Sequence, residues 1–209
     1  MVDLTALAVE RAERWESKLP PDAFNFDDSY SGRKGRHLLN NLAGTFLPYI
    51  EVGCYLGSTL IAAAYDNPGL VVGVDNFTDE TKPGRYMVEN RRRLLERLSH
   101  FSDRARPSLI DAPCWDLKLT GFLCGFYDGD HSAQAHIDAL VKLAPWFSQS
   151  FVYVIDDYNR QNVRDGTAAG ISAARLKVDF EMRLGEHAPP DDRLGWWNGI
   201  GVFVFTKSI

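Results

Sequence analysis

The sequence predicts an α/β fold: a doubly wound, mostly parallel seven-stranded sheet that ends in an antiparallel hairpin, with helices on both faces. Apolar runs that end in Gly or Asp recur along the chain with helix-sized segments between them, as expected when strands alternate with helices. Several runs are apolar on consecutive residues, which is typical of strands covered on both faces. Apolar residues at helical spacing lie between the runs.

The expected strands cover residues 48–53, 70–75, 105–110, 121–128, 151–156, 176–183 and 200–206. After the fourth strand, the apolar residues between Ala133 and Ala144 follow a helical period, and Asp130 is placed to cap that helix. Residues 185–197, which include Pro189 and Pro190, are expected to connect the last two strands as a hairpin.

The chain before the first strand is expected to form a small N-terminal part of a single domain, residues 1–47 beside a core of residues 48–209. Apolar residues between positions 4 and 15 suggest a short amphipathic helix that Pro20 and Pro21 end. The polar, Gly-containing segment 25–36 is expected to be a lid or a connector.

Composition narrows the class of protein. The chain has 209 residues, 45% of them apolar, enough for one domain with a full core. A formal net charge of -5 gives no general attraction to nucleic acid or to an anionic membrane, so neither is an expected partner. Three cysteines without C-x-x-C spacing argue against disulfides and zinc and fit a reducing cytoplasm. We recognise no signal peptide and no apolar run of the ~20 residues that span a membrane, so a soluble, cytoplasmic protein is expected.

A glycine turn follows the first expected strand. Glu51 precedes two glycines with G-x-x-x-G spacing, Gly53 and Gly57, and Asp75 ends the next strand. A dinucleotide site would need a glycine at the position of Tyr55, where a pyrophosphate approaches the backbone. Because Asp75 can accept hydrogen bonds from both hydroxyls of a ribose, these residues fit S-adenosylmethionine better than NAD. The alternative is a helix-packing turn with a surface acid.

Further candidate cofactor contacts lie after the second and third strands. Asp111 and Ala112 stand where an adenine contact is expected, although an acid in a loop is often only solvated. The complete set of candidates is Glu51, Gly53, Tyr55, Gly57, Ser58, Thr59, Asp75, Asn76, Asp111, Ala112 and Asp128.

Two acidic runs also end apolar strands. Asp128 follows the fourth strand, and Asp156 and Asp157 follow the fifth. Since ligands lie outside the carboxyl ends of parallel strands, neighbouring strands would bring these carboxylates together, where Mg²⁺ could join them. Adjacent strand residues point to opposite faces, so Asp156 and Asp157 can both ligate only if the backbone leaves the sheet there. The alternative is that these acids, and Asp130 above all, cap helices or form turns.

His131 lies three residues after Asp128 and is a candidate general base, although a lone histidine is more often a surface or capping residue. Four further residues are expected to line an acceptor pocket or, as aromatics beside a sheet often do, to belong to the core. They are Tyr30, Arg33, Trp196 and Trp197.

Together these motifs resemble the class I S-adenosylmethionine-dependent methyltransferases. Four motifs carry the resemblance: Glu51-x-Gly53-x-x-x-Gly57-Ser58-Thr59, Val74-Asp75, Tyr127-Asp128-Gly129-Asp130-His131-Ser132 and Ile155-Asp156-Asp157-Tyr158. Over residues 48–157, the sequence is most similar to the branch of macrocin-type sugar O-methyltransferases and cephalosporin-hydroxylase-like proteins, with the catechol type more distant. The resemblance implies that Asp128, Asp156 and Asp157 bind Mg²⁺, that His131 is the base, and that the acceptor is a hydroxyl of a sugar, a phenol or a natural product.

The sequence departs from this pattern in two places. Residues 146–150, before the fifth strand, lack the usual glycine, and the N-terminal segment is short for the macrolide enzymes, which leaves the acceptor undefined. A metal-dependent hydrolase or hydroxylase-like relative on the same fold stays open, although acyl hydrolysis would call for a G-x-S-x-G turn. A non-catalytic nucleoside-binding module or a homo-oligomer subunit also stays open.

Overall fold

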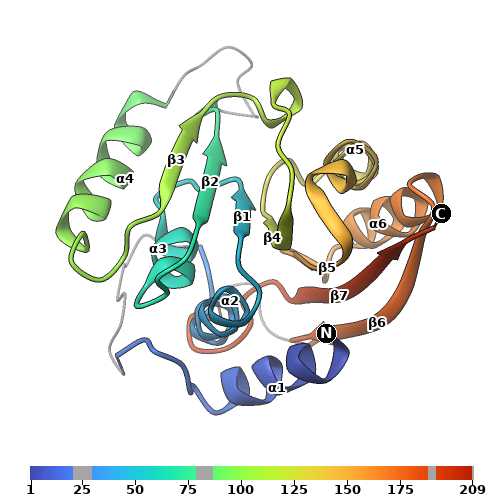
Figure 1. Cartoon of the computed structure of the whole chain (residues 1–209), viewed down its shortest axis with the longest axis horizontal. Coiled ribbons are helices and arrows are strands. Elements are labelled where there is room, and N and C mark those ends of the chain that lie inside the picture. The colour runs from blue at the N-terminus through green and yellow to red at the C-terminus, as the bar shows by residue number, and fades with distance from the viewer. Residues whose placement is uncertain (21–29, 79–86, 188–191, 209) are drawn as a thin grey trace.

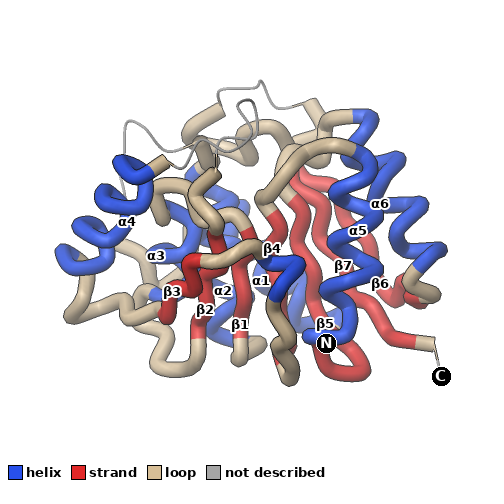
Figure 2. Tube along the Cα trace, turned by 90° about the horizontal axis from the view of Figure 1, so that it is seen from above, coloured by secondary structure: helices blue, strands red, loops and turns tan. Residues whose placement is uncertain are grey.

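The computed structural model describes residues 1–20, 30–78, 87–187 and 192–208 (Figure 1). One sheet runs through the molecule with the strand order β3-β2-β1-β4-β5-β7-β6 (Figure 2). Parallel pairing joins β1 to β2 and β4, β2 to β3, and β4 to β5, whereas β7 is antiparallel to both β5 and β6. The predicted doubly wound sheet with a terminal antiparallel hairpin is therefore confirmed.

All seven predicted strands are present. They are β1 (Tyr49–Val52), β2 (Val71–Asp75), β3 (Ser108–Asp111), β4 (Phe122–Tyr127), β5 (Phe147–Ile155), β6 (Leu176–Leu184) and β7 (Ile200–Lys207). β5 begins four residues earlier than predicted, so the segment that lacks the usual glycine is itself part of the strand. The register of β4 against β5 shifts between Phe122 and Cys124, which accommodates the longer strand.

Helices cover both faces of the sheet. They are α1 (Val2–Glu13), α2 (Arg33–Thr45), α3 (Ser58–Ala64), α4 (Val88–His100), α5 (Ala133–Leu143) and α6 (Gln161–Ala173), with short 3-10 turns at Cys114–Asp116 and Ala144–Trp146. Successive strand residues divide between two cores: Tyr49 and Phe126 pack with α1, α2 and α3, while Ile50 and Tyr127 pack with α5 and α6. This alternation explains why the strands are apolar on consecutive residues.

The N-terminal part differs from the prediction. Residues 33–45 form the helix α2, where the sequence suggested a lid or connector that extended to residue 36. Polar residues of α2 are buried: His37 Nδ1 lies 2.8 Å from Ser17 Oγ, and the Asn40 amide donates to the carbonyls of Ala62 and Tyr65. Residues 25–29 of the predicted lid, with Pro21, Pro189 and Pro190, lie outside the described residues.

Two smaller expectations are corrected. α1 ends at Glu13, well before Pro20. The cap of α5 is Ser132, whose hydroxyl accepts the amide N–H of Ala135, and Asp130 instead accepts the amide N–H of Ser132 in the preceding turn. The cap therefore lies next to the helix, and the acid two residues earlier shapes the approach to it.

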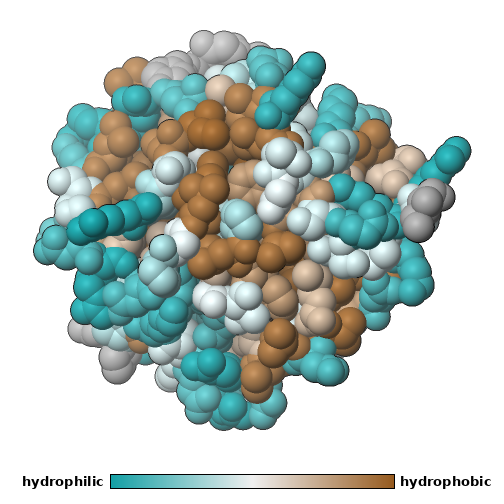
Figure 3. Space-filling view, in the orientation of Figure 1, coloured by the Kyte–Doolittle hydropathy of each residue, from teal (hydrophilic) through white to brown (hydrophobic). Residues whose placement is uncertain are grey.

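The surface is mixed in polarity. In the space-filling view, apolar residues occupy much of the middle of the molecule and hydrophilic residues border them (Figure 3). Among the described residues, no helix has the length and apolar character that a membrane span requires.

Candidate active site

A cavity of about 750 Å³ lies beyond the carboxyl ends of β1, β2, β4 and β5. The carboxyl ends of a parallel sheet are where ligands bind in this class of fold. The lining residues come both from the glycine turn and from the acidic runs after β4 and β5. From the predicted set they are Tyr30, Gly53, Tyr55, Asp75, Asn76, Ala112, Asp128, His131, Asp156, Asp157 and Trp197.

The glycine turn after β1 depends on backbone geometry. Gly53 has a φ of +90° and its amide donates to the carbonyl of Val74 at 2.9 Å. A Cβ at Gly53 would lie 2.0 Å from the carbonyl oxygen of Asp128, so only glycine lets the turn after β1 lie against the end of β4. Gly57 has a φ of +82° and stands at the N-cap of α3. Gly53 therefore joins the predicted cofactor side of the cavity to the acidic side.

Asp75 holds the same turn from the end of β2. One carboxylate oxygen accepts the amide N–H groups of Cys54 at 2.7 Å and Tyr55 at 2.8 Å, and the other accepts the amide N–H of Phe77 at 2.6 Å. A carboxylate has about four acceptor positions. The three backbone bonds leave Asp75 about one position for a ligand, which is fewer than the two that a ribose held through both hydroxyls would occupy.

Glu51 lies beneath the turn, fully buried. Thr59 donates its hydroxyl proton to Glu51 Oε1 at 2.7 Å, and the Tyr49 hydroxyl donates to Oε2 at 3.3 Å. Burial raises the pKa of Glu51 to about 8, against the lowering effect of these two hydrogen bonds. Neither Glu51 nor Thr59 is among the described residues that line the cavity, so both support the turn from the protein interior.

The remaining candidates of the cofactor side divide between cavity and support. Asn76 lines the cavity, and its side-chain oxygen accepts the amide N–H of Thr78 at 3.1 Å. Ala112 also lines it, whereas Asp111 forms an ion pair with Arg91 at 2.6 Å. The hydroxyl oxygens of Ser58 and Ser31 lie 3.1 Å apart. The described residues that line the cavity do not include Ser58, Gly57 or Asp111.

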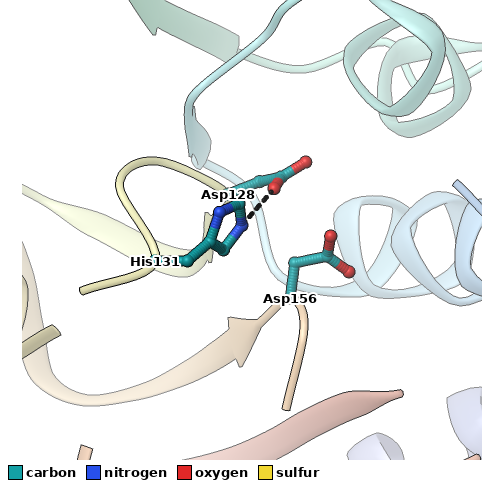
Figure 4. Close-up of side chains that lie close together, drawn as sticks. All are labelled: Asp128, His131 and Asp156. Atoms are coloured by element: carbon teal, nitrogen blue, oxygen red, sulfur yellow. Dashed lines mark ion pairs between the residues drawn. The ribbon is translucent and has the colours of Figure 1, made fainter. Parts of the chain in front are cut away.

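The acidic side brings together three side chains from two strands. Asp128 and His131 come from the loop after β4 and Asp156 from the end of β5, and their side chains point toward one another (Figure 4). Their potential ligand atoms all lie within 4.8 Å of one another. The predicted convergence of the segments after β4 and β5 is therefore present, with His131 as a member of the group.

Asp157 points to a different set of partners. β5 ends at Ile155, and Asp157 has a φ of +53°, so the backbone leaves the sheet at this point, as the sequence argument required. Its Oδ2 atom lies 2.9 Å from Nε of Arg160 and 3.5 Å from Nε2 of His131. Asp157 thus supports the group from the side, through an arginine and the histidine.

The charges of this group are suited to a cation. Burial, followed by the neighbouring carboxylates, raises the pKa of Asp128 and of Asp156 well above the usual range. Nε2 of His131 is buried, has no hydrogen-bond partner among the described residues, and lies 3.4 Å from Asp128 Oδ1. The carboxyl oxygens of Asp128 and Asp156 form a donor set for a divalent ion, and the unsatisfied imidazole nitrogen lies beside them.

The predicted acceptor residues separate in the structure. Tyr30, Tyr55 and Trp197 line the cavity as a connected aromatic group, with ring centroids 5.6 Å apart for Tyr30–Tyr55 and 6.2 Å apart for Tyr30–Trp197. Trp196 belongs to the core and donates its ring N–H to Glu13 at 3.0 Å. Arg33 lies over the ring of Trp15 at 4.5 Å, and the described lining residues include neither it nor Trp196.

Several lining residues were missed by the sequence analysis. Cys114 and Trp115 follow β3 on the cofactor side, and Arg160 and Asn198 stand on the acceptor side. The position of Arg160, three residues after Asp157, is a signal that the sequence did contain. No sequence signal marked Asn198. It lies at the cavity because its segment pairs with the one after β5, where its carbonyl accepts the amide N–H of Asn159 at 3.0 Å.

Solved structures with this fold share little sequence with the chain. A methyltransferase from Podospora anserina with bound SAH has a TM-score of 0.61 at 15% identity, over 99% of this chain and 88% of that chain. A candidate O-methyltransferase from Klebsiella pneumoniae has a TM-score of 0.57 at 15% identity, over 98% and 90% of the two chains. The chain has the class I methyltransferase fold.

Within this class I methyltransferase fold, similarity does not indicate the acceptor. A candidate RNA methyltransferase from Pyrococcus horikoshii has a TM-score of 0.58 at 11% identity, over 98% of this chain and 96% of that chain. No protein-family model and no curated protein matches the sequence. The acceptor must therefore be argued from the cavity of this chain.

Proposed function

We propose that the protein is an S-adenosylmethionine-dependent and Mg²⁺-dependent O-methyltransferase that acts on a hydroxyl of a small molecule. One observation carries the proposal. A single cavity has the glycine turn, Asp75 and Asn76 on one side and the Asp128–His131–Asp156 group on the other. A nucleoside cofactor and a cation-bound hydroxyl would meet in such a cavity, and a low-molecular-weight acceptor suits its volume.

The two sides would share the work of the reaction. Methyl transfer from a sulfonium is an in-line displacement, so the cavity must hold the acceptor oxygen opposite the departing sulfur. On the cofactor side, we assign Gly53, Tyr55 and Asn76 to contacts with the cofactor, and the remaining acceptor position of Asp75 to one ribose hydroxyl.

On the acidic side, Asp128 and Asp156 would hold the cation, with Asp157 close by. A bound Mg²⁺ lowers the pKa of a coordinated hydroxyl. His131 Nε2 would then take the hydroxyl proton, because it is the imidazole nitrogen that faces the group and has no hydrogen-bond donor or acceptor of its own among the described residues.

Calorimetry tests the proposal directly. S-adenosylmethionine, its demethylated product SAH and NAD are titrated into the protein with EDTA and then with Mg²⁺. We expect SAH to bind and NAD not to bind, and Asp75→Ala to weaken SAH binding by at least about tenfold because the turn loses its anchor. Binding of NAD alone would overturn the proposal. If SAH binds but no hydroxyl compound is methylated, with or without Mg²⁺, a non-catalytic nucleoside-binding module would be favoured.

The cysteines give the orientation of the cofactor without an activity assay. Cys54 and Cys124 are buried, whereas Cys114 is partly exposed and lines the cavity on the expected adenine side. Burial raises the pKa of the Cys114 thiol to about 11, so alkylation will be slow but confined to this residue. We expect SAH to slow alkylation at Cys114. An unchanged rate at saturating SAH would mean that the nucleoside lies elsewhere.

A further inference from the structure

Arg160 is the only Arg or Lys among the described residues that line the cavity. It follows β5 and Asp157, and half of its side chain is exposed. The other charged lining residues include Asp75, Asp128, Asp156 and Asp157. A single guanidinium at the rim of an acidic cavity is either a counter-ion for these carboxylates or a contact for a ligand.

The geometry of Arg160 leaves part of the guanidinium for a ligand. Its Nε atom forms an ion pair with Asp157 Oδ2 at 2.9 Å, which holds the guanidinium beside that carboxylate. No other described residue bonds its two terminal nitrogens, which carry four N–H groups. Parallel N–H groups on a guanidinium match the two oxygens of a carboxylate or phosphate.

The backbone places Arg160 beside an aromatic wall. The amides of Tyr158 and Asn159 donate to the carbonyls of Gly199 and Asn198, both at 3.0 Å, so the segment that carries Arg160 lies along the segment that follows Trp197. Trp197 in turn continues into Tyr30 and Tyr55 through the ring contacts described above. Tyr30 is 61% exposed although it lines a cavity, and Tyr55 is 37% exposed.

These rings suit a flat, apolar ligand body. Aromatic faces stack on another ring in offset or edge-on geometry, and such pairs add about 0.5–1.5 kcal/mol beyond the area that they bury. A sugar would present several hydroxyls, each of which needs a polar partner when it is buried. On this wall the described polar lining groups are the side chains of Asn198 and Arg160 and the hydroxyls of Tyr30 and Tyr55 themselves.

We propose that the acceptor is an aromatic hydroxy acid whose ring lies against Tyr30 and Trp197 and whose anionic group binds the terminal nitrogens of Arg160. The inference rests on the proposed function, because it identifies the acceptor of that reaction. In the loaded site a divalent cation and a sulfonium would offset the cavity carboxylates, so an anion at the rim would not meet an uncompensated negative field.

Matched acids and amides test the inference. The SAH- and Mg²⁺-saturated protein is titrated with 3- and 4-hydroxybenzoate and with the corresponding hydroxybenzamides, which differ only in charge. We expect at least one of the acids to bind about tenfold or more tightly than its amide. In Arg160→Gln this preference disappears while the affinity for the amide stays, and Arg160→Lys gives an intermediate preference. The control Arg92→Gln removes a similarly exposed, ion-paired arginine on α4 and keeps the preference.

Each outcome separates the two proposals. The first titration is SAH alone, and its failure to bind would refute the proposed function. SAH binding with equal affinity for acid and amide would refute the aromatic acid only, and so would a preference that survives in Arg160→Gln. Tighter binding of glucuronate than of the hydroxybenzoates would refute the aromatic ring. A loss of SAH affinity in Arg160→Gln with the acid preference intact would assign Arg160 to the cofactor.

Discussion

The two sides of the cavity differ in how far the protein satisfies its own polar groups. On the cofactor side, Asp75 accepts three backbone amides and the buried Glu51 accepts two hydroxyls. On the acidic side, the Asp128 and Asp156 carboxyls hydrogen-bond to each other while the closeness of Asp128 raises the pKa of Asp156, and His131 has a buried nitrogen with no hydrogen-bond partner among the described residues. The cofactor side is therefore shaped in advance, whereas the acidic side requires a cation to be complete.

The same comparison explains where a motif is informative. An acid that ends a strand points to a ligand on the acidic side, but on the cofactor side the acids mainly hold the turn itself. Substitutions on the acidic side should change ligand binding more than folding. Substitutions on the cofactor side should change both.

The largest effect is expected where the two sides join. Gly53→Ala would place a Cβ 2.0 Å from the carbonyl oxygen of Asp128, and it would also hold alanine at a φ of +90°. Because the turn and the end of β4 must then move apart, we expect a loss of about 3–5 kcal/mol in the free energy of unfolding, together with loss of SAH binding. Urea unfolding and calorimetry measure the two effects.

Gly121 is a matched control for this substitution. It has a φ of +89°, and a Cβ there would meet nothing within 4 Å. Gly121→Ala therefore tests the backbone strain alone, which should cost about 1–2 kcal/mol. Similar losses in the two variants would show that the contact between Gly53 and Asp128 does not join the two sides.

The sequence predicted what local patterns determine. All seven strands were found. The strands inside the sheet carry the continuous apolar runs of strands buried on both faces, whereas the edge strands β3 and β6 are largely exposed. The convergence after β4 and β5 followed from parallel pairing alone. In contrast, α2 was missed although Leu38, Leu39 and Leu42 follow a helical spacing, because the polar residues among them are buried only once α1 and α3 cover them. Contacts that form only between distant segments leave no local pattern.

The site residues show the same limit. Sequence spacing placed Glu51 with the cofactor contacts, but it does not determine whether a buried acid faces the cavity or the core beneath the turn. Trp196 and Trp197 are adjacent, yet one packs in the core and the other lines the cavity. The direction of each side chain depends on Trp197 having a φ of +55°, which its sequence neighbours do not signal.

The next effect concerns the acidic side and has opposite signs for stability and for function. Asp128→Asn removes one of two buried, mutually repelling carboxyls, so in EDTA the free energy of unfolding should rise by about 1–2 kcal/mol. The same substitution removes a cation ligand, so the increase in melting temperature on adding Mg²⁺ or Mn²⁺ should disappear, with SAH affinity nearly unchanged. Thermal unfolding with and without each ion measures both.

The exposed Asp103 serves as the control, since Asp103→Asn should keep the wild-type response to the ions. If Asp128→Asn destabilises the protein in EDTA and still gains stability from the ions, the acidic side is complete without a cation and the comparison fails.

The last effect tests the cofactor side through pH. The pKa of Glu51 is raised from 4.5 to about 8, so between these values the folded protein holds a proton that the unfolded chain has released. Stability from this group is full below the lower value and falls as pH rises, by about 2 kcal/mol between about pH 6 and about pH 8. Glu51→Gln stays neutral, so in EDTA its stability should fall less across this range than that of the wild type. The exposed Glu10 has no such environment, and Glu10→Gln should follow the wild-type curve. Parallel curves for wild type and Glu51→Gln would mean that Glu51 is ionised in the folded protein, and that the cofactor side also holds an uncompensated charge.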